Sequence, residues 1–172
     1  RIGAIPHRVE TMELLDEGSL LYTTWVSLMD QQEQDPEDYH VVDELPFWRN
    51  ETKSFTNKAR IHLFRFDLER GKSEELMGEH FHVASVGHYG KRVVCAAKHF
   101  VHKAPTTDDL WLLNLASGGR RCLSREEYAF GGVGGQPKPV FLSEHIVAIL
   151  GTDMCQYGIR ESWEVLTFDL RN

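Results

Sequence analysis

The stretch FRFDLERGKSEEL, residues 64–76, has a second copy in WLLNLASGGRRCL, residues 111–123, and the two align without a gap. A shorter third copy, VLTFDLRN, covers residues 165–172. The shared positions are Phe66, Asp67 and Leu68, then Leu113, Asn114 and Leu115, then Phe168, Asp169 and Leu170. Apolar residues recur at every second position, and the two longer copies continue to a glycine, Gly71 or Gly118. This period of two predicts a strand that enters a hairpin.

A second hairpin pattern lies upstream of each copy. Its first two examples are DEGSLLYT, residues 16–23, and YGKRVVCAA, residues 89–97. The third, PVFLSEHIVAIL at residues 139–150, has no glycine in its turn. Two hairpins make four strands, and the units recur about every 50 residues, a period typical of β-propeller blades.

The predicted fold is therefore all-β: a partial β-propeller of four-stranded antiparallel blades, with two full blades and most of a third. Residues 1–172 form one partial propeller domain in this interpretation. Blade one runs from about 9 to 77 with an inserted loop at 29–60, blade two from about 81 to 124, and blade three begins near 138 and is incomplete. Because propellers close with roughly four to eight blades, we expect the open ends to be covered by missing blades of a parent chain or by other copies.

The composition excludes several classes of function. The chain has 19 Lys plus Arg against 26 Asp plus Glu, a net charge of -7, so no nucleic-acid partner is expected. No apolar run approaches the roughly 18 residues of a membrane helix, so no membrane partner is expected either. Cys95, Cys122 and Cys155 have neither disulfide-framework nor zinc-ligand spacing. We therefore expect a cytoplasmic protein without a metal or other cofactor.

The sequence assigns no catalytic residue. A serine hydrolase needs Gly-x-Ser-x-Gly, because small flanking residues permit the sharp turn that exposes the nucleophile, and no serine here has both glycines. The histidines lack the HExxH spacing of a zinc protease. The run GGVGG at residues 131–135 matches no phosphate-binding motif and is interpreted as a connection between blades. We expect this chain alone to have no hydrolase activity.

The inserted loop carries the candidate binding residues. Residues 30–44 contain seven acids and no Lys or Arg, whereas residues 49–60 contain four bases and one acid. At the junction of the two segments lie Leu45, Pro46, Phe47, Trp48 and Arg49, which we interpret as a candidate interface or substrate-facing loop, because binding residues favour loops on rigid scaffolds. The alternative is a solvated insertion whose charged halves attract weakly, with the aromatic residues filling their own blade.

The chain resembles the propeller region of the prolyl oligopeptidase family of serine peptidases, and in particular its acylaminoacyl-peptidase-like branch. The resemblance rests on the two turn-and-strand stretches DEGSLLYT and YGKRVVCAA, on DDLWLLNLASGGRRCLS at residues 108–124, and on YHVVDELPFWRNETKSFTNKARIHLFRFDLERG at residues 39–71. It covers about residues 11–170. The resemblance departs from the family pattern because no proline precedes the turn acid.

This resemblance implies a non-catalytic propeller segment that gates peptide access to an α/β-hydrolase domain absent from this chain. The partners it implies are that hydrolase domain, the missing blades and, through the parent, peptide substrates. The alternative is a TolB-like or other non-enzymatic propeller that serves as a protein-interaction scaffold. A carbohydrate-active propeller would need convergent carboxylates, which these three blades do not supply.

Overall fold

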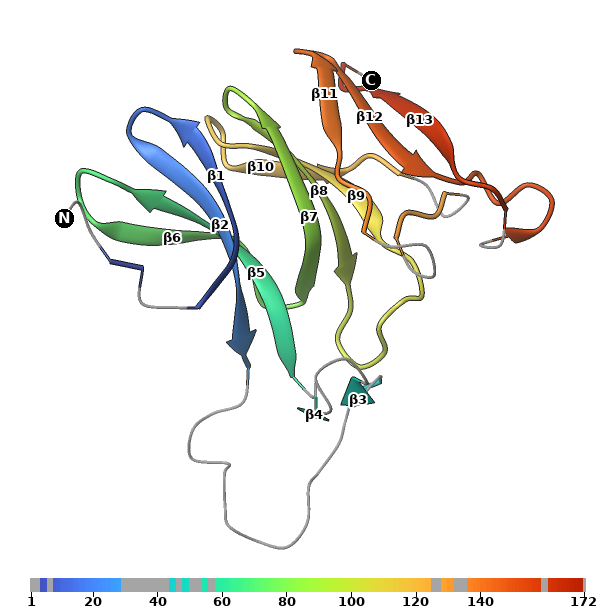
Figure 1. Ribbon diagram of the computed structural model, residues 1–172, viewed down its shortest axis with the longest axis horizontal. Coiled ribbons are helices and arrows are strands. Elements are labelled where there is room, and N and C mark those ends of the chain that lie inside the picture. Colours follow the sequence, from blue (N-terminus) through green and yellow to red (C-terminus); the bar gives the residue numbers. More distant parts are fainter. Residues whose placement is uncertain are drawn as a thin grey trace, which may run out of the picture. The chain divides into compact units, whose positions relative to one another are not determined.

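The computed structural model describes residues 4–5, 8–28, 44–45, 48–49, 54–55, 58–124, 128–131, 136–158 and 161–171. Within these ranges the secondary structure is made of β-strands and turns, with no α-helix. The fold is all-β, a partial β-propeller with two four-stranded sheets and a third sheet of three strands, which confirms the predicted class (Figure 1). Two compact units divide the chain: residues 1–82 with 99–105, and residues 83–98 with 106–172.

The first sheet has the strand order β1-β2-β5-β6. Its strands are β1 (Val9–Asp16), β2 (Ser19–Ser27), β5 (Ala59–Asp67) and β6 (Lys72–Met77). The insertion between β2 and β5 carries two short strands that pair antiparallel, β3 (Trp48–Arg49) and β4 (Ser54–Phe55). The sequence analysis expected a loop here and missed this hairpin, because two-residue strands leave no alternation to detect.

The second and third sheets repeat the same meander. The second sheet, in the order β10-β9-β8-β7, contains β7 (Phe81–Tyr89), β8 (Arg92–His99), β9 (Asp109–Asn114) and β10 (Gly119–Cys122). The third sheet contains β11 (Val140–Ser143), β12 (Ile146–Gly151) and β13 (Glu164–Asp169). In the described residues β13 is therefore an edge strand, whereas its counterparts β5 and β9 have neighbours on both sides.

The sequence repeat has a direct cause in the turns after β5, β9 and β13. Asp67 Oδ1 accepts the backbone N–H groups two and three residues further on, at 3.0 and 2.8 Å. Asn114 Oδ1 and Asp169 Oδ1 each accept the N–H two residues on, at 2.9 and 3.0 Å. Gly71 and Gly118 then adopt φ of 63° and 70°, a left-handed conformation that favours glycine. The repeated Asp or Asn and the repeated Gly are thus the residues that this turn requires.

The repeated leucine joins the two hairpins of each sheet. Its backbone N–H donates to a carbonyl in the preceding hairpin turn: Leu68 to Gly18 at 2.9 Å, Leu115 to Lys91 at 2.9 Å and Leu170 to His145 at 2.8 Å. Leu68 also packs against the core of the first unit, and Leu170 is part of the core of the second. The three matched stretches therefore occupy the same place in their sheets.

The core of the first unit is aromatic. Tyr22, Phe64 and Phe66 are buried on one face of the first sheet, and the rings of Tyr22 and Phe64 stack with centroids 5.2 Å apart. Burial of each such ring stabilises the fold by roughly 1.5–3 kcal/mol. The Tyr22 hydroxyl reaches the sheet edge, where it donates to Ser73 Oγ at 2.8 Å. The phenol therefore buries its ring without leaving its polar end unpaired.

Candidate functional site

The structure places part of the predicted binding loop. Leu45 is 52% exposed, and Trp48 and Arg49 form β3, paired with Phe55 and Ser54 of β4. Pro46 and Phe47 lie outside the described residues. The described part of the loop therefore contains a short hairpin that begins at Trp48.

A buried ion pair holds the base of this loop. Arg60, near the start of β5, donates from one terminal nitrogen to Glu44 Oε1 at 2.6 Å, and its side chain is only 1% exposed. Glu44 Oε2 accepts the backbone N–H of Lys58 at 2.8 Å. The carboxylate thus receives hydrogen bonds from both a buried guanidinium and the backbone, which is the condition under which a buried charge is tolerated.

Arg60 also binds the segment that follows β8. Its guanidinium lies over the ring of Phe100, 4.2 Å from the centroid, and donates to the carbonyl of Val101 at 3.2 Å. A guanidinium can stack and donate in this way at once because it is planar and carries five N–H groups. One arginine therefore fastens both the insertion and the residues after β8 to β5.

Backbone pairing strengthens this anchor at Leu45. Its N–H donates to the carbonyl of His102 at 2.7 Å, and its carbonyl accepts the N–H of Ala104 at 2.8 Å. Leu45 and Lys103 consequently form a parallel β-bridge. The main chain at Leu45 is held on both sides while its side chain projects outward, so the residues that follow start from a fixed point.

The sequence analysis missed Glu44 as a structural residue. It counted Glu44 among the acids of a solvated segment, whereas the structure buries it at 7% exposure against Arg60. The change from an acidic to a basic run was the only signal in the sequence for such a pair, and the expectation of a solvated segment is wrong for Glu44. The buried ion pair joins residues that are 16 positions apart in the chain. The composition of the two charged runs does not specify which acid meets which base.

A buried carboxyl group, that of Asp108, lies at the start of β9 in the second unit. Asp108 is 3% exposed, and its Oδ1 has no hydrogen-bond partner among the described residues. Burial raises the pKa of Asp108 to about 6, the nearby Lys98 ammonium opposes the rise, and Asp109 adds to it. Its backbone N–H donates to Phe130 at 2.8 Å. This backbone bond holds the carboxyl in place, away from water.

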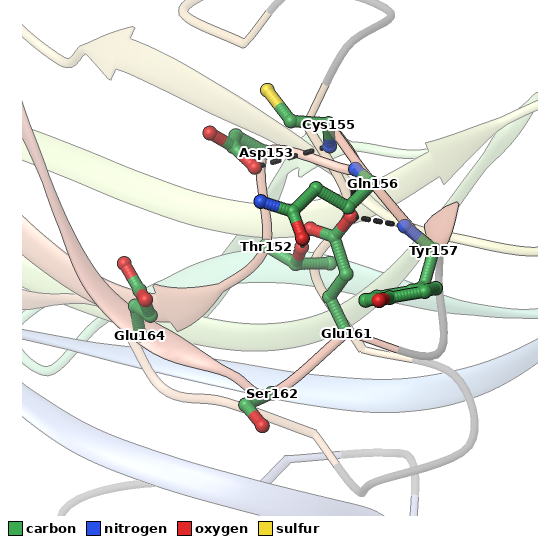
Figure 2. Close-up of a pocket in the computed structure, with 8 residues that line it drawn as sticks. All are labelled: Thr152, Asp153, Cys155, Gln156, Tyr157, Glu161, Ser162 and Glu164. Atoms are coloured by element: carbon green, nitrogen blue, oxygen red, sulfur yellow. Dashed lines mark hydrogen bonds between the residues drawn. The ribbon is translucent and has the colours of Figure 1, made fainter.

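The loop between β12 and β13 encloses a cavity of about 410 Å³ (Figure 2). Its lining residues are Thr152, Asp153, Cys155, Gln156, Tyr157, Glu161, Ser162 and Glu164. Figure 2 shows the Glu161 carboxylate turned back toward the loop backbone, where it accepts the N–H groups of Gln156 and Tyr157. The Thr152 hydroxyl donates to its other oxygen at 2.8 Å.

Hydrogen bonds explain the charge state of this cavity. The backbone bond from Tyr157 is the main cause that lowers the pKa of Glu161. The side-chain bond with Cys155 is the main cause that lowers the pKa of Asp153. The Glu161 and Asp153 carboxylates therefore remain ionised, and both accept hydrogen bonds from the backbone of the loop.

The described residues bring no catalytic constellation together. His62 Nδ1 and Glu75 Oε1 are 2.6 Å apart, but the histidine side chain is 2% exposed and cannot reach a substrate. No three His, Cys, Asp or Glu side chains in the described ranges could hold a metal ion. Nor does the part of the chain that the structure describes include a helix with the length and apolar character needed to cross a bilayer.

The order and pairing of the strands in these sheets place the chain in the class of β-propeller folds. No protein-family model and no curated protein matches it. Its fold is similar to the acylaminoacyl peptidase of Pyrococcus horikoshii, with a TM-score of 0.62 in the orthorhombic crystal form and 0.61 in the uncomplexed structure. Both are 15% identical, and the match covers 94% of this chain and 24% of that chain.

A third structure shows the same likeness. It is an acylaminoacyl peptidase in complex with Z-Gly-Gly-Phe-chloromethyl ketone, with a TM-score of 0.61 and 15% identity over 96% of this chain and 24% of that chain. This sequence therefore spans about a quarter of the length of the peptidases that it matches. The likeness shows that the fold is shared.

Proposed function

We propose that this chain is a non-catalytic propeller segment of a serine peptidase of the acylaminoacyl-peptidase or prolyl oligopeptidase type. The observation that carries the proposal is the fold likeness to acylaminoacyl peptidases across nearly the whole chain, 94–96% of its length. The blade motifs at residues 39–71 and 108–124 add sequence support. Because no serine lies in a Gly-x-Ser-x-Gly motif, the nucleophile would belong to a hydrolase domain outside these residues.

In this proposal the propeller gates peptide access to that hydrolase domain, and residues 45–49 face the substrate. The anchor at Glu44 and Arg60 supports this role, because a loop that sorts substrates by size must keep its position when they press against it. The main-chain bonds of Leu45 serve the same purpose. We also propose a cytoplasmic location, consistent with three cysteines that form no disulfide among the described residues.

An active-site serine probe tests the peptidase assignment. The whole product of the gene that encodes this chain and the 172-residue chain alone are each treated with a fluorophosphonate. We expect one serine of the whole product, outside this chain, to be labelled and the isolated chain to remain unlabelled. A whole product that takes no label would contradict the peptidase and favour the non-enzymatic scaffold.

A substrate-length comparison tests gating separately. Glu44→Gln, which weakens the anchor, and Trp48→Ala, within the loop, are introduced into the whole product. We expect kcat/KM for a long acetylated peptide to rise relative to a short one, while Glu17→Gln in the exposed turn between β1 and β2 changes neither. Equal changes for both lengths would refute gating and leave the peptidase assignment standing.

A further inference from the structure

A single hydrogen bond closes the segment that follows β8. Residues 83–98 and 106–172 belong to the second unit, whereas residues 99–105, which we call the excursion, belong to the first. Lys98 is thus the last residue before the excursion, and Thr106 is the first residue after it. The Lys98 ammonium donates to the Thr106 carbonyl at 3.3 Å. This hydrogen bond, which we call the neck bond, joins the two ends of the excursion.

The excursion carries part of the anchor of the candidate loop. The His102 carbonyl accepts the N–H of Leu45, and the Ala104 N–H donates to the Leu45 carbonyl. The Val101 carbonyl accepts a hydrogen bond from the Arg60 guanidinium at 3.2 Å. The position of the excursion therefore fixes the main chain of Leu45. A change in the neck bond would act on this anchor through the chain itself.

A buried carboxyl lies opposite the lysine of the neck bond. Ala97 of β8 pairs with Asp109 of β9, so the same register places Lys98 opposite Asp108. Asp108 is 3% exposed, and its Oδ1 has no hydrogen-bond partner among the described residues, because the Lys98 ammonium is bonded to Thr106. This arrangement suits a neutral carboxyl, since an ionised one would leave a charged oxygen buried without a hydrogen bond.

Lys98 is the cation that the described residues offer to an ionised Asp108. The charges that act on this carboxyl are the Lys98 ammonium on β8 and the Asp109 carboxylate on β9. The segment 128–131, which forms an antiparallel bridge with Asp108, contains the phenol of Tyr128 and no lysine, arginine or histidine. The lysine stem is flexible, and its ammonium can turn from one acceptor to another.

We propose that Asp108 and Lys98 form a pH-sensitive switch: when Asp108 ionises, the Lys98 ammonium leaves the Thr106 carbonyl for the carboxylate, and the neck bond opens. The pKa of Asp108 is raised to about 6 by burial, so the carboxyl is neutral at pH 5 and ionised at pH 7.5. The neck bond is therefore closed on the acid side and open on the alkaline side. Opening loosens the excursion and weakens the hydrogen bonds at Leu45. The switch does not depend on the peptidase proposal.

Carbon-13 NMR of the chain between pH 4.5 and pH 8 tests the exchange of partners. We expect the carboxyl carbon of Asp108 and the carbonyl carbon of Thr106 to change chemical shift with one shared midpoint near pH 6. Asp108→Asn keeps the shape but cannot ionise, so the Thr106 signal should stay constant. Lys98→Met should also give a constant Thr106 signal, while Asp108 titrates at higher pH because the opposing cation is gone. Asp109→Asn is the matched control: it removes the neighbouring carboxyl and should retain the shared transition.

Proton shifts of the anchor amides test the effect on the loop. The amide protons of Leu45 and Ala104 should move upfield with the same midpoint, because their hydrogen bonds lengthen when the excursion loosens. Histidines commonly titrate in this range, so the part due to the switch is the part that Asp108→Asn removes. These shifts report folded molecules, so a change in global stability does not enter them.

Three results would overturn the switch. A Thr106 signal that stays constant while Asp108 titrates would show that Lys98 does not leave. An Asp108 midpoint at its ordinary value near 3.8 would show that the carboxyl is ionised throughout. A Thr106 transition that persists in Asp108→Asn would assign it to another group. The first two results come from the unmodified chain, so they hold even if a variant does not fold.

Discussion

Asp108→Asn should stabilise this protein, and its effect should grow with pH. Burial raises the pKa of the Asp108 carboxyl from its ordinary 3.8 to about 6, so the folded state holds a proton that the unfolded state releases between these two values. Stability therefore falls as pH rises through this window, and the loss is complete above about pH 6. At 1.36 kcal/mol per pKa unit, the full loss is about 3 kcal/mol. Asparagine has nearly the same shape and no charge, so it escapes this loss.

The measurement is urea unfolding of the unmodified chain and the Asp108→Asn variant at pH 5 and pH 7.5, at one low protein concentration. Linkage places roughly half of this loss at pH 5 and nearly all of it at pH 7.5. The difference in unfolding free energy between variant and unmodified chain should thus increase by about 1–2 kcal/mol over this range. Any pH-independent effect of the amide cancels in this comparison.

Glu17→Gln is the control, because Glu17 is an exposed carboxyl in the turn between β1 and β2. Its difference from the unmodified chain should be close to constant over the same range. An Asp108→Asn difference that stays flat from pH 5 to 7.5 would refute the reasoning, since it would mean that the folded carboxyl ionises as readily as the unfolded one.

Three further substitutions probe the fold and the loop anchor by urea unfolding. Glu44→Ala should cost about 3–5 kcal/mol, because it leaves the Arg60 guanidinium buried and unpaired; a double variant with Arg60→Met should recover much of this loss, and failure to recover would contradict the pairing. Gly71→Ala should cost about 1 kcal/mol or more because φ is 63° there, whereas Gly71→Asn should cost less; equal losses would argue against backbone strain. Gly87→Ala would place a Cβ 2.2 Å from the Pro139 carbonyl oxygen, so we expect the free energy of unfolding to fall by about 1–3 kcal/mol. An unchanged urea midpoint would show that the backbone at Pro139 can move away from residue 87.

The fold could be predicted from the sequence because the residue patterns that specify its strands and turns are local. Alternation of apolar residues defines a strand whichever sheet the strand joins, and the turns after β5 and β9 need a left-handed residue wherever they occur. Gly71 and Gly118 carry this requirement with φ of 63° and 70°, and Asp67 and Asn114 accept the turn N–H groups. Because residues a few positions apart form the whole turn, the same residue types recur at each copy of the turn in the sequence.

Residues Leu45 to Arg49 were chosen as the candidate loop because they lie where an acidic run changes to a basic one, and a binding role for them stays a prediction. The structure anchors the main chain of Leu45 beside Lys103. The short hairpin of β3 and β4 was not foreseen, because two residues per strand produce no periodic pattern.

The sequence by itself determined the longer strands, their turns and the repeat of the hairpins, because these depend on residues a few positions apart. Only the tertiary structure decided which charges are buried. Glu44 meets Arg60 across 16 residues, and Asp108 is enclosed at the strand start where its backbone bonds to Phe130. Removal of a carboxylate from water depends on which distant segments surround it, and that environment determines both its partner and its pKa.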